Sequence, residues 1–328
     1  MKHIKILATG GTIAGRGANA QSTTGYQAGA INIEDLLTSV PGIDSLANIS
    51  SEQIANIGSQ DMTEDILITL ARRCEDLLQD SDVDGIVITH GTDTLEETAY
   101  FLHLTVHSSK PIVVVGAMRP ATALSSDGPI NLLNAVNVAA ADNSHGQGVL
   151  VLMNDEIYSA RDVSKINTAN VAAFKAPTAG PLGFIVGGVV IYTHKSILKH
   201  TTYSPFSLSG IAKLPRVDII YTHINEDRIL IDACVAAGAK GIVYAGSGMG
   251  SIHQNAFPGL ADASRQGIVV VRSSRTGSGI VAPSLPKWTE AGFLDGDSLN
   301  PQKARILLQL ALTITEAHEQ IQDYFHNY

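Results

Sequence analysis

The chain has 328 residues, of which 45% are hydrophobic and 5% aromatic, and its formal net charge is -9. This length favours two domains of unequal size. The acidic balance and the lack of a basic run argue against nucleic acid or an anionic membrane as a partner, because both require clustered Lys and Arg. The only cysteines, Cys74 and Cys234, are expected to be buried thiols rather than a disulfide, and two cysteines cannot form a metal framework.

The first predicted element is a buried parallel strand that begins at His3 and ends near Thr9, where an apolar run stops and two glycines follow. Gly10 and Gly11 let the backbone adopt positive φ and let a ligand approach it closely. The hydroxyl of Thr12 would then lie beside bare backbone, where chemistry could take place. An ordinary strand-to-helix turn is the alternative interpretation of these residues.

The next segment, 16–29, is rich in Gly, Ala, Ser, Thr and Gln and holds one aromatic residue, Tyr26. This composition predicts a mobile loop or hairpin, which could act as a lid. Strands and helices alternate beyond it, which predicts right-handed βαβ units and a doubly wound, mostly parallel sheet. The predicted strands cover 54–58, 85–89, 111–115 and 148–153, and the predicted helices cover 33–39 and a stretch from 63.

The hydrophobic pattern is lost between 192 and 215, which predicts a linker between a larger domain at 1–191 and a smaller α/β domain at 216–328. Pro301 follows Asn300 at a first helical position, where its missing N–H costs nothing. In this smaller domain the predicted strands cover 217–221, 241–244 and 268–271, and the last helix covers about 301–317.

Thr94 and Glu97 have the spacing of a capping box, directly after the predicted strand at 85–89. Thr92 and Asp93 should therefore lie in the turn that opens a helix. Ligands of open α/β sheets bind beyond the carboxyl ends of the strands, so these two residues are candidates for a site.

Two threonines, Thr12 and Thr92, each follow a glycine after a strand, and a lysine in a polar stretch, Lys165, could complete a set with Asp93. A threonine hydroxyl is a poor nucleophile unless a base or a hydrogen-bond chain stabilises the alkoxide. A desolvated lysine can serve as that base. Taken singly, Asp93 has the bland interpretation of a helix cap and Lys165 that of a solvated charge, so the set carries meaning only jointly.

Other kinds of site find no support in the sequence. There is no G-x-S-x-G elbow, no H-E-x-x-H helix, no zinc spacing and no Walker loop, so no metal or cofactor is expected. Gly10, Gly11 and Gly15 do not fit G-x-G-x-x-G, which leaves a nucleotide-dependent oxidoreductase as a weak alternative.

Six motifs are spread over the whole chain. The two long blocks are ATGGTIAG at 8–15 and VITHGTDTLEETA at 87–99. The others are GSQDM at 58–62, GAMRP at 116–120, SSDGPINLLNAV at 125–136 and SLNPQKARILLQLALT at 298–313. Together these motifs resemble the bacterial L-asparaginases and glutaminase-asparaginases.

The resemblance implies hydrolysis of a side-chain amide: asparagine and water give aspartate and ammonia through an acyl-enzyme on threonine. On the matching positions, Thr12 would be the nucleophile and Tyr26 its hydrogen-bonded neighbour. Thr92, Lys165 and Asp93 would form a second polar set that activates the hydroxyl or the attacking water. Which of these roles each group takes stays open at this point.

The resemblance also implies the groups that bind substrate. Ser59 and Gln60 would hold the α-carboxylate and Asp93 the α-amino group. The backbone N–H of Thr92 and the region of Ala117 would face the developing oxyanion. Gly11 would line the same site.

Members of the family place the site at a dimer interface within a homotetramer. By resemblance, Ser251 would reach the neighbour's site, at a position where many asparaginases have Asn and some members with glutaminase activity have Ser. The usual glutamate of the neighbour is missing: Leu285 or Pro286 matches its position, and Glu290 lies several residues late. Glu290 is therefore left out of the expected site.

The sequence predicts an L-asparaginase with secondary glutaminase activity. The alternatives are a non-catalytic amino-acid sensor on the same scaffold and the nucleotide-dependent oxidoreductase. No apolar stretch is of transmembrane length, and the first strand begins close to Met1. These features favour a cytoplasmic protein, with a periplasmic location as the alternative if a leader preceded this numbering.

Overall fold

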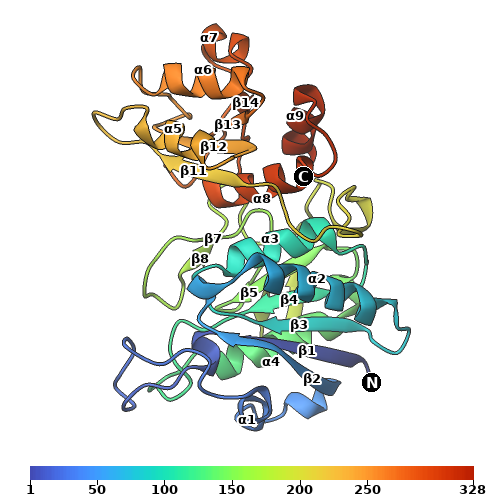
Figure 1. Ribbon diagram of the computed structural model, residues 1–328. Helices are drawn as coiled ribbons and strands as arrows, with labels where there is room; N and C mark the ends of the chain where they lie inside the picture. Colours follow the sequence, from blue (N-terminus) through green and yellow to red (C-terminus); the bar gives the residue numbers. More distant parts are fainter. The chain divides into compact units, whose positions relative to one another are not determined.

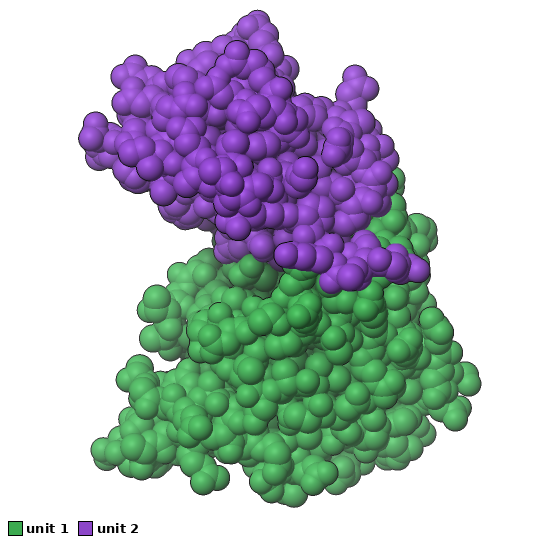
Figure 2. Space-filling model, in the orientation of Figure 1, with its two compact units in different colours: residues 1–208 green, residues 209–328 purple.

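The computed structural model describes all residues, Met1–Tyr328. The chain divides into two compact units, Met1–Leu208 and Ser209–Tyr328 (Figure 2). The division falls within the segment 192–215 for which the sequence predicts a linker, and that segment also holds a short 3-10 turn at Thr201–Tyr203. None of the helices has the length and apolar character needed to cross a bilayer.

The first unit is built on an eight-stranded sheet in the order β10-β9-β6-β5-β4-β3-β1-β2 (Figure 1). The strands β2, β1, β3, β4 and β5 run parallel, whereas β6, β9 and β10 extend the sheet in antiparallel pairs. Their bounds are β1 (His3–Gly10), β2 (Asn48–Ile57), β3 (Gly85–Thr89), β4 (Ile112–Val115), β5 (Val149–Met153), β6 (Glu156–Ser159), β9 (Gly183–Val186) and β10 (Val189–Tyr192).

Helices cover both faces of this sheet, which confirms the doubly wound fold. On one face, α1 (Ile33–Thr38) and α4 (Gly128–Ala140) pack against alternate strand residues in one apolar cluster. On the other face lie α2 (Glu64–Gln79) and α3 (Leu95–Thr105) (Figure 1). Every residue of β3, β4 and β5 is buried, as expected for parallel strands that are covered on both sides.

The strand order 2-1-3-4-5 of the parallel part creates a topological switch point between β1 and β3. There the hydroxyl of Thr9 donates to the carbonyl of Thr89 at 2.9 Å and joins the two carboxyl ends. The following loops touch through Gly11 and Gly91: a Cβ on Gly11 would lie 2.3 Å from the Gly91 backbone, and Gly11 has φ +82°. Glycine at both positions therefore lets the two loops meet.

The second unit has a four-stranded parallel sheet, which confirms the smaller α/β domain. Helices α5, α6 and α7 pack on one face through Ile231, Leu260 and Trp288, and Leu308 of α8 packs next to Gly241 on the sheet. The elements are β11 (Val217–Tyr221), β12 (Gly241–Gly246), β13 (Val269–Ser274), β14 (Leu294–Asp295), α5 (Ile229–Ala236), α6 (Phe257–Arg265), α7 (Pro286–Glu290), α8 (Pro301–Ala311) and α9 (His318–Asn327).

The structure confirms the predicted starts of α3 and α8, but it differs from the predicted end of α8 and from the predicted capping box. The side chain of Asn300 accepts from the amide of Lys303 at 3.0 Å, so α8 begins where the sequence predicts. It ends at Ala311, before the predicted end, and the separate helix α9 follows. The capping box at Thr94 is not formed, because the Thr94 hydroxyl instead donates to the carbonyl of Ser59 at 2.8 Å.

Both cysteines are free thiols. Cys74 is fully buried in α2, and this burial raises the pKa of its thiol far above the ordinary value. Cys234 is only half-buried, so the expectation of a buried residue is wrong there: helix α5 buries mainly Ile231 and presents the rest of its short length outward.

Candidate active site

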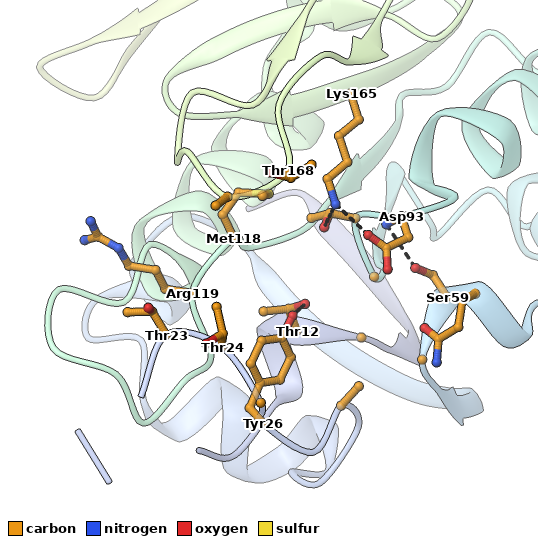
Figure 3. A pocket seen from close by; sticks show the side chains of 18 residues that line it. Thr12, Thr23, Thr24, Tyr26, Ser59, Asp93, Met118, Arg119, Lys165 and Thr168 are labelled. Atoms are coloured by element: carbon orange, nitrogen blue, oxygen red, sulfur yellow. Dashed lines mark hydrogen bonds and ion pairs between the residues drawn. The ribbon is translucent and has the colours of Figure 1, made fainter. Parts of the chain in front are cut away.

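A pocket of about 500 Å³ opens beyond the carboxyl ends of β1 and β3, at the switch point (Figure 3). It belongs entirely to the first unit. Its lining is formed by Gly11, Thr12, Thr23, Thr24, Gly25, Tyr26, Ala28, Gly58, Ser59, Gln60, Gly91, Thr92, Asp93, Met118, Arg119, Lys165, Thr168 and Ala169.

Thr12 is the first residue of a 3-10 turn that follows β1, and it is only 6% exposed. Its hydroxyl lies 2.6 Å from the hydroxyl of Tyr26, and the two side chains point toward each other in Figure 3. Tyr26 comes from the predicted loop or hairpin, whose base is closed by two backbone hydrogen bonds between Arg16 and Gln27 (2.9 and 3.0 Å). The segment 16–29 is therefore a hairpin at its base, and it places the Tyr26 hydroxyl beside the Thr12 hydroxyl.

A second polar set lies across the pocket from Thr12. Lys165 donates from Nζ to Thr92 Oγ1 at 2.9 Å and to Asp93 Oδ1 at 2.6 Å. Thr92 is 4% exposed, and the side chains of Lys165 and Asp93 are 16% and 61% exposed. The ammonium thus bridges a buried hydroxyl and a solvated carboxylate, an arrangement that can hold and move a proton at Thr92.

The turn after β2 brings a third loop to the pocket. The hydroxyl of Ser59 accepts from the backbone N–H of Asp93 at 3.1 Å, and the Thr94 hydroxyl donates to the Ser59 carbonyl. Gln60 donates from Nε2 to Asp61 at 3.0 Å. Two bonds therefore connect the Ser59 turn to the loop that carries Thr92 and Asp93, although the residues are more than 30 positions apart in the chain.

A buried histidine supports the Thr92 loop from behind. The ring of His90 is fully buried, which lowers the pKa of His90 to about 4, against the opposing effect of its bond to the Gly91 carbonyl. Nδ1 donates to that carbonyl at 2.7 Å, and Nε2, 2.8 Å from the Thr98 hydroxyl, accepts from it in the neutral ring. His90 is therefore neutral at pH 7 and fixes the backbone just before Thr92.

The structure brings most of the predicted site residues to this one pocket. Two predicted residues are not part of its lining: Ala117 is fully buried, and Ser251 belongs to the second unit. The residues that line it are Gly11, Thr12, Tyr26, Ser59, Gln60, Thr92, Asp93 and Lys165.

Met118 and Arg119 also line the pocket, as their place directly after the predicted strand at 111–115 indicates, whereas sequence reasoning missed Thr168. The amides of Met118 and Arg119 donate to the carboxylate of Asp127, both at 2.9 Å, and these bonds shape the loop after β4. Thr168 lies beyond Lys165 in a hairpin that the sequence did not predict, formed by β7 (Ser164–Lys165) and β8 (Phe174–Lys175).

The fold and the pocket define a two-domain α/β protein that offers two hydroxyls, an amine and a carboxylate to a small polar ligand. The profile "Asparaginase, N-terminal" matches residues 3–198, and the profile "Glutaminase/Asparaginase C-terminal domain" matches residues 216–325. The chain belongs to the asparaginase family, a family of amidohydrolases.

The sequences of individual relatives are similar to this chain over its full length. L-asparaginase 2 of Bacillus subtilis (strain 168) is 52% identical over 100% of this chain and 87% of its own length. Glutaminase-asparaginase of Pseudomonas fluorescens biotype A is 44% identical over 100% of this chain and 91% of its own. The crystal structure of a probable cytoplasmic L-asparaginase from Campylobacter jejuni is 49% identical, with a TM-score of 0.98 over 100% of both chains.

Proposed function

We propose that this protein hydrolyses the side-chain amide of L-asparagine to L-aspartate and ammonia, with secondary activity on L-glutamine. The observation that carries the proposal is the bridge from the Lys165 ammonium to Thr92 and Asp93, in the same pocket as the hydrogen-bonded pair Thr12 and Tyr26. The names of the relatives, L-asparaginase and glutaminase-asparaginase, support both substrates.

The reaction follows two steps, formation of an acyl-enzyme and its hydrolysis. In the first, Thr12 Oγ1 bonds to the amide carbon, the threonine proton passes by way of Tyr26 to the amide nitrogen, and the C–N bond breaks as ammonia leaves. In the second, water attacks the ester carbon and one of its protons passes to the set of Thr92, Lys165 and Asp93. The ester C–O bond then breaks, a proton from this set returns to Thr12 Oγ1, and aspartate leaves.

The loops around these groups supply the binding contacts. Ser59 and Gln60 hold the α-carboxylate, and the exposed carboxylate of Asp93 holds the α-ammonium group, which favours free amino acids over peptides. The backbone N–H of Thr92, with the backbone near Ala117, faces the oxyanion. Such a donor contributes roughly 3 kcal/mol to the transition state in well-studied hydrolases.

The same proposal includes a homotetramer with sites at dimer interfaces, to which Ser251 of a neighbouring subunit contributes. Exposed apolar side chains at the edges of both sheets support an assembly. On the β9–β10 edge these are Phe184, Val186, Val189 and Ile191, and along and beyond the β11 edge they are Ile219, Tyr221, Ile229 and Leu230.

A mixing experiment tests the shared site. Thr12→Ala and Ser251→Asp subunits are each expected to be weakly active, and refolding them together should restore one intact site for every mixed dimer. Light scattering gives the mass of the assembly in the same samples. A monomer of full activity, or no recovery on mixing, would reject the interface site while leaving the chemistry of the pocket untouched.

A cytoplasmic location is a further part of the proposal. The similarity to the probable cytoplasmic L-asparaginase of Campylobacter jejuni supports it. Fractionation of cells that make the protein from its own gene, with marker enzymes for each compartment, tests it, and recovery with the periplasmic marker would overturn it.

An ammonia assay with both amides tests the function. Thr12→Ala, Thr92→Ala and Lys165→Met should each lower turnover at least about 1,000-fold with the fold intact. Thr38→Ala, which removes an exposed hydroxyl outside the pocket, is the matched control and should retain full turnover. Binding of asparagine without ammonia release would indicate the sensor instead, and stabilisation by NAD or NADP would indicate the oxidoreductase.

A further inference from the structure

Lys165 lies on an unusually small piece of secondary structure. Its strand β7 has two residues and pairs only with the two-residue strand β8, with Lys165 opposite Phe174 and Ser164 opposite Lys175. One further backbone bond, from the Ile166 amide to the Ala173 carbonyl at 2.8 Å, extends the hairpin. An isolated two-stranded ladder is marginal in water, so other contacts must fix the Lys165 ammonium at 2.6–2.9 Å from its partners.

Strand β6 of the main sheet provides those contacts. The Tyr158 hydroxyl donates to the carbonyl of Phe174 at 2.8 Å, which is the residue opposite Lys165, and to the carboxylate of Glu156 in a three-centre bond. Lys175 donates from Nζ to the same Glu156 carboxylate at 2.6 Å. Both residues of β8 are therefore bonded to β6.

The anchor formed by Tyr158, Glu156 and Lys175 is well suited to hold the β7–β8 hairpin in place. Tyr158 and Phe174 are buried, and Tyr158 pairs with Val151 of β5 inside the eight-stranded sheet. Burial and the neighbouring Glu156 carboxylate raise the pKa of Tyr158 well above its ordinary value, so the phenol stays a protonated donor. A hydrogen bond that is sheltered from water in this way resists exchange with solvent.

We propose that Tyr158, together with Glu156 and Lys175, is a positioning group that fixes the β7–β8 hairpin and thereby the Lys165 ammonium against Thr92 and Asp93. None of the three anchor residues lines the pocket, so their effect on turnover passes through Lys165. The inference rests on the function proposed above, in which Lys165 takes part in the chemistry and not in substrate binding.

The test compares three single substitutions. Tyr158→Phe removes the anchoring hydroxyl, and Lys175→Met removes only the ion pair on the 39% exposed side chain, so the second variant is expected to fold even if the first does not. Tyr192→Phe is the matched control, because Tyr192 is a partly buried tyrosine of this domain that lies on β10. Its hydroxyl lies 2.9 Å from the Ser144 hydroxyl and has no bond to the hairpin.

Two readouts are needed, and one of them does not depend on activity. Amide hydrogen exchange at Ile166 should accelerate about 10-fold or more in Tyr158→Phe and stay unchanged in Tyr192→Phe. In the ammonia assay, kcat should fall about 10- to 100-fold in Tyr158→Phe with KM within about twofold, because a small misplacement of a catalytic group costs that much. Lys175→Met should lower kcat about threefold, the size expected for a partly exposed ion pair.

Unchanged kcat in Tyr158→Phe and Lys175→Met, an equal loss in Tyr192→Phe, or an equal rise in KM would overturn the positioning role. Unchanged exchange at Ile166 would overturn the anchor itself. If the unsubstituted protein releases no ammonia from either amide, the proposed function fails instead, and the exchange measurement still decides whether Tyr158 holds the hairpin.

Discussion

The buried ring of His90 predicts a specific loss of stability in acid. In the folded protein the pKa of His90 lies near 4, against an ordinary value of 6.5, because burial disfavours the imidazolium. Between these values the unfolded chain binds a proton that the folded chain does not. The contribution of the neutral ring to the free energy of unfolding is therefore fully present above pH 6.5 and is lost as the pH falls toward 4.

The size of the effect follows from the two values. One pH unit between them corresponds to about 1.4 kcal/mol, so the interval from 6.5 to about 4 corresponds to roughly 3 kcal/mol. This is a large share of the stability of an ordinary domain. The replacement His90→Gln removes the titration and keeps one donor and one acceptor for the Gly91 carbonyl and the Thr98 hydroxyl.

Urea unfolding at a fixed protein concentration, repeated from pH 7.5 to 4, measures the prediction. The free energy of unfolding of the unsubstituted protein should fall by roughly 3 kcal/mol relative to His90→Gln over this interval. Burial also lowers the pKa of His200, but both proteins contain His200, so its contribution cancels in the difference.

A difference between the two proteins that stays constant from pH 7.5 to 4 would refute the reasoning. So would a relative gain in stability of the unsubstituted protein on acidification, because that sign requires an imidazolium stabilised by the fold. Such a result would mean that His90 is hydrated or paired with an acid.

Three further predictions concern the loops and helix ends. Thr94→Val should raise KM about 10-fold with little change in kcat, since it frees the turn of Ser59, and Thr94→Ser should restore KM in the same assay. Gly11→Ala should abolish ammonia release and cost about 3 kcal/mol in urea unfolding, because φ is +82° and the new Cβ would meet Gly91 at 2.3 Å. Asn300→Ala should lower the free energy of unfolding by about 1 kcal/mol without changing kcat, through loss of the cap on α8.

Local sequence patterns were sufficient to predict an element where its bounds depend only on residues within it or next to it. The run Gly85–Thr89 is a strand with the predicted bounds, because five consecutive apolar or small residues between turns favour a strand that is buried on both faces. The start of α8 was also predictable, since the Asn300 cap bonds within three residues of itself. The motifs around Thr12 and Thr92 indicated the family for the same reason: each is a continuous stretch of chain.

Local patterns failed where a distant partner competes for the same group. Thr94 directly precedes α3 in the capping position, as predicted, but its hydroxyl donates to the Ser59 carbonyl. Ser59 is 35 residues away, and a capping rule considers only neighbouring residues. The two-residue strands β7 and β8 are too short to show periodicity, so no local pattern predicts the hairpin that presents Lys165. Helix α9 lies beyond the predicted elements, because the helical pattern after Asn300 predicts a single helix to about 317, whereas α8 ends at Ala311.

The sequence by itself determined the family, the alternating strands and helices, and the types of group available for chemistry, because these depend on composition and on short continuous motifs. The sequence groups Lys165 with Thr92 and Asp93, which lie 73 and 72 positions earlier in the chain. Only the tertiary structure decided that the ammonium donates to both of them and that the Tyr158 hydroxyl donates to the hairpin that carries Lys165. The physical reason is that such contacts are set by strand order and register, to which residues throughout the sheet contribute together.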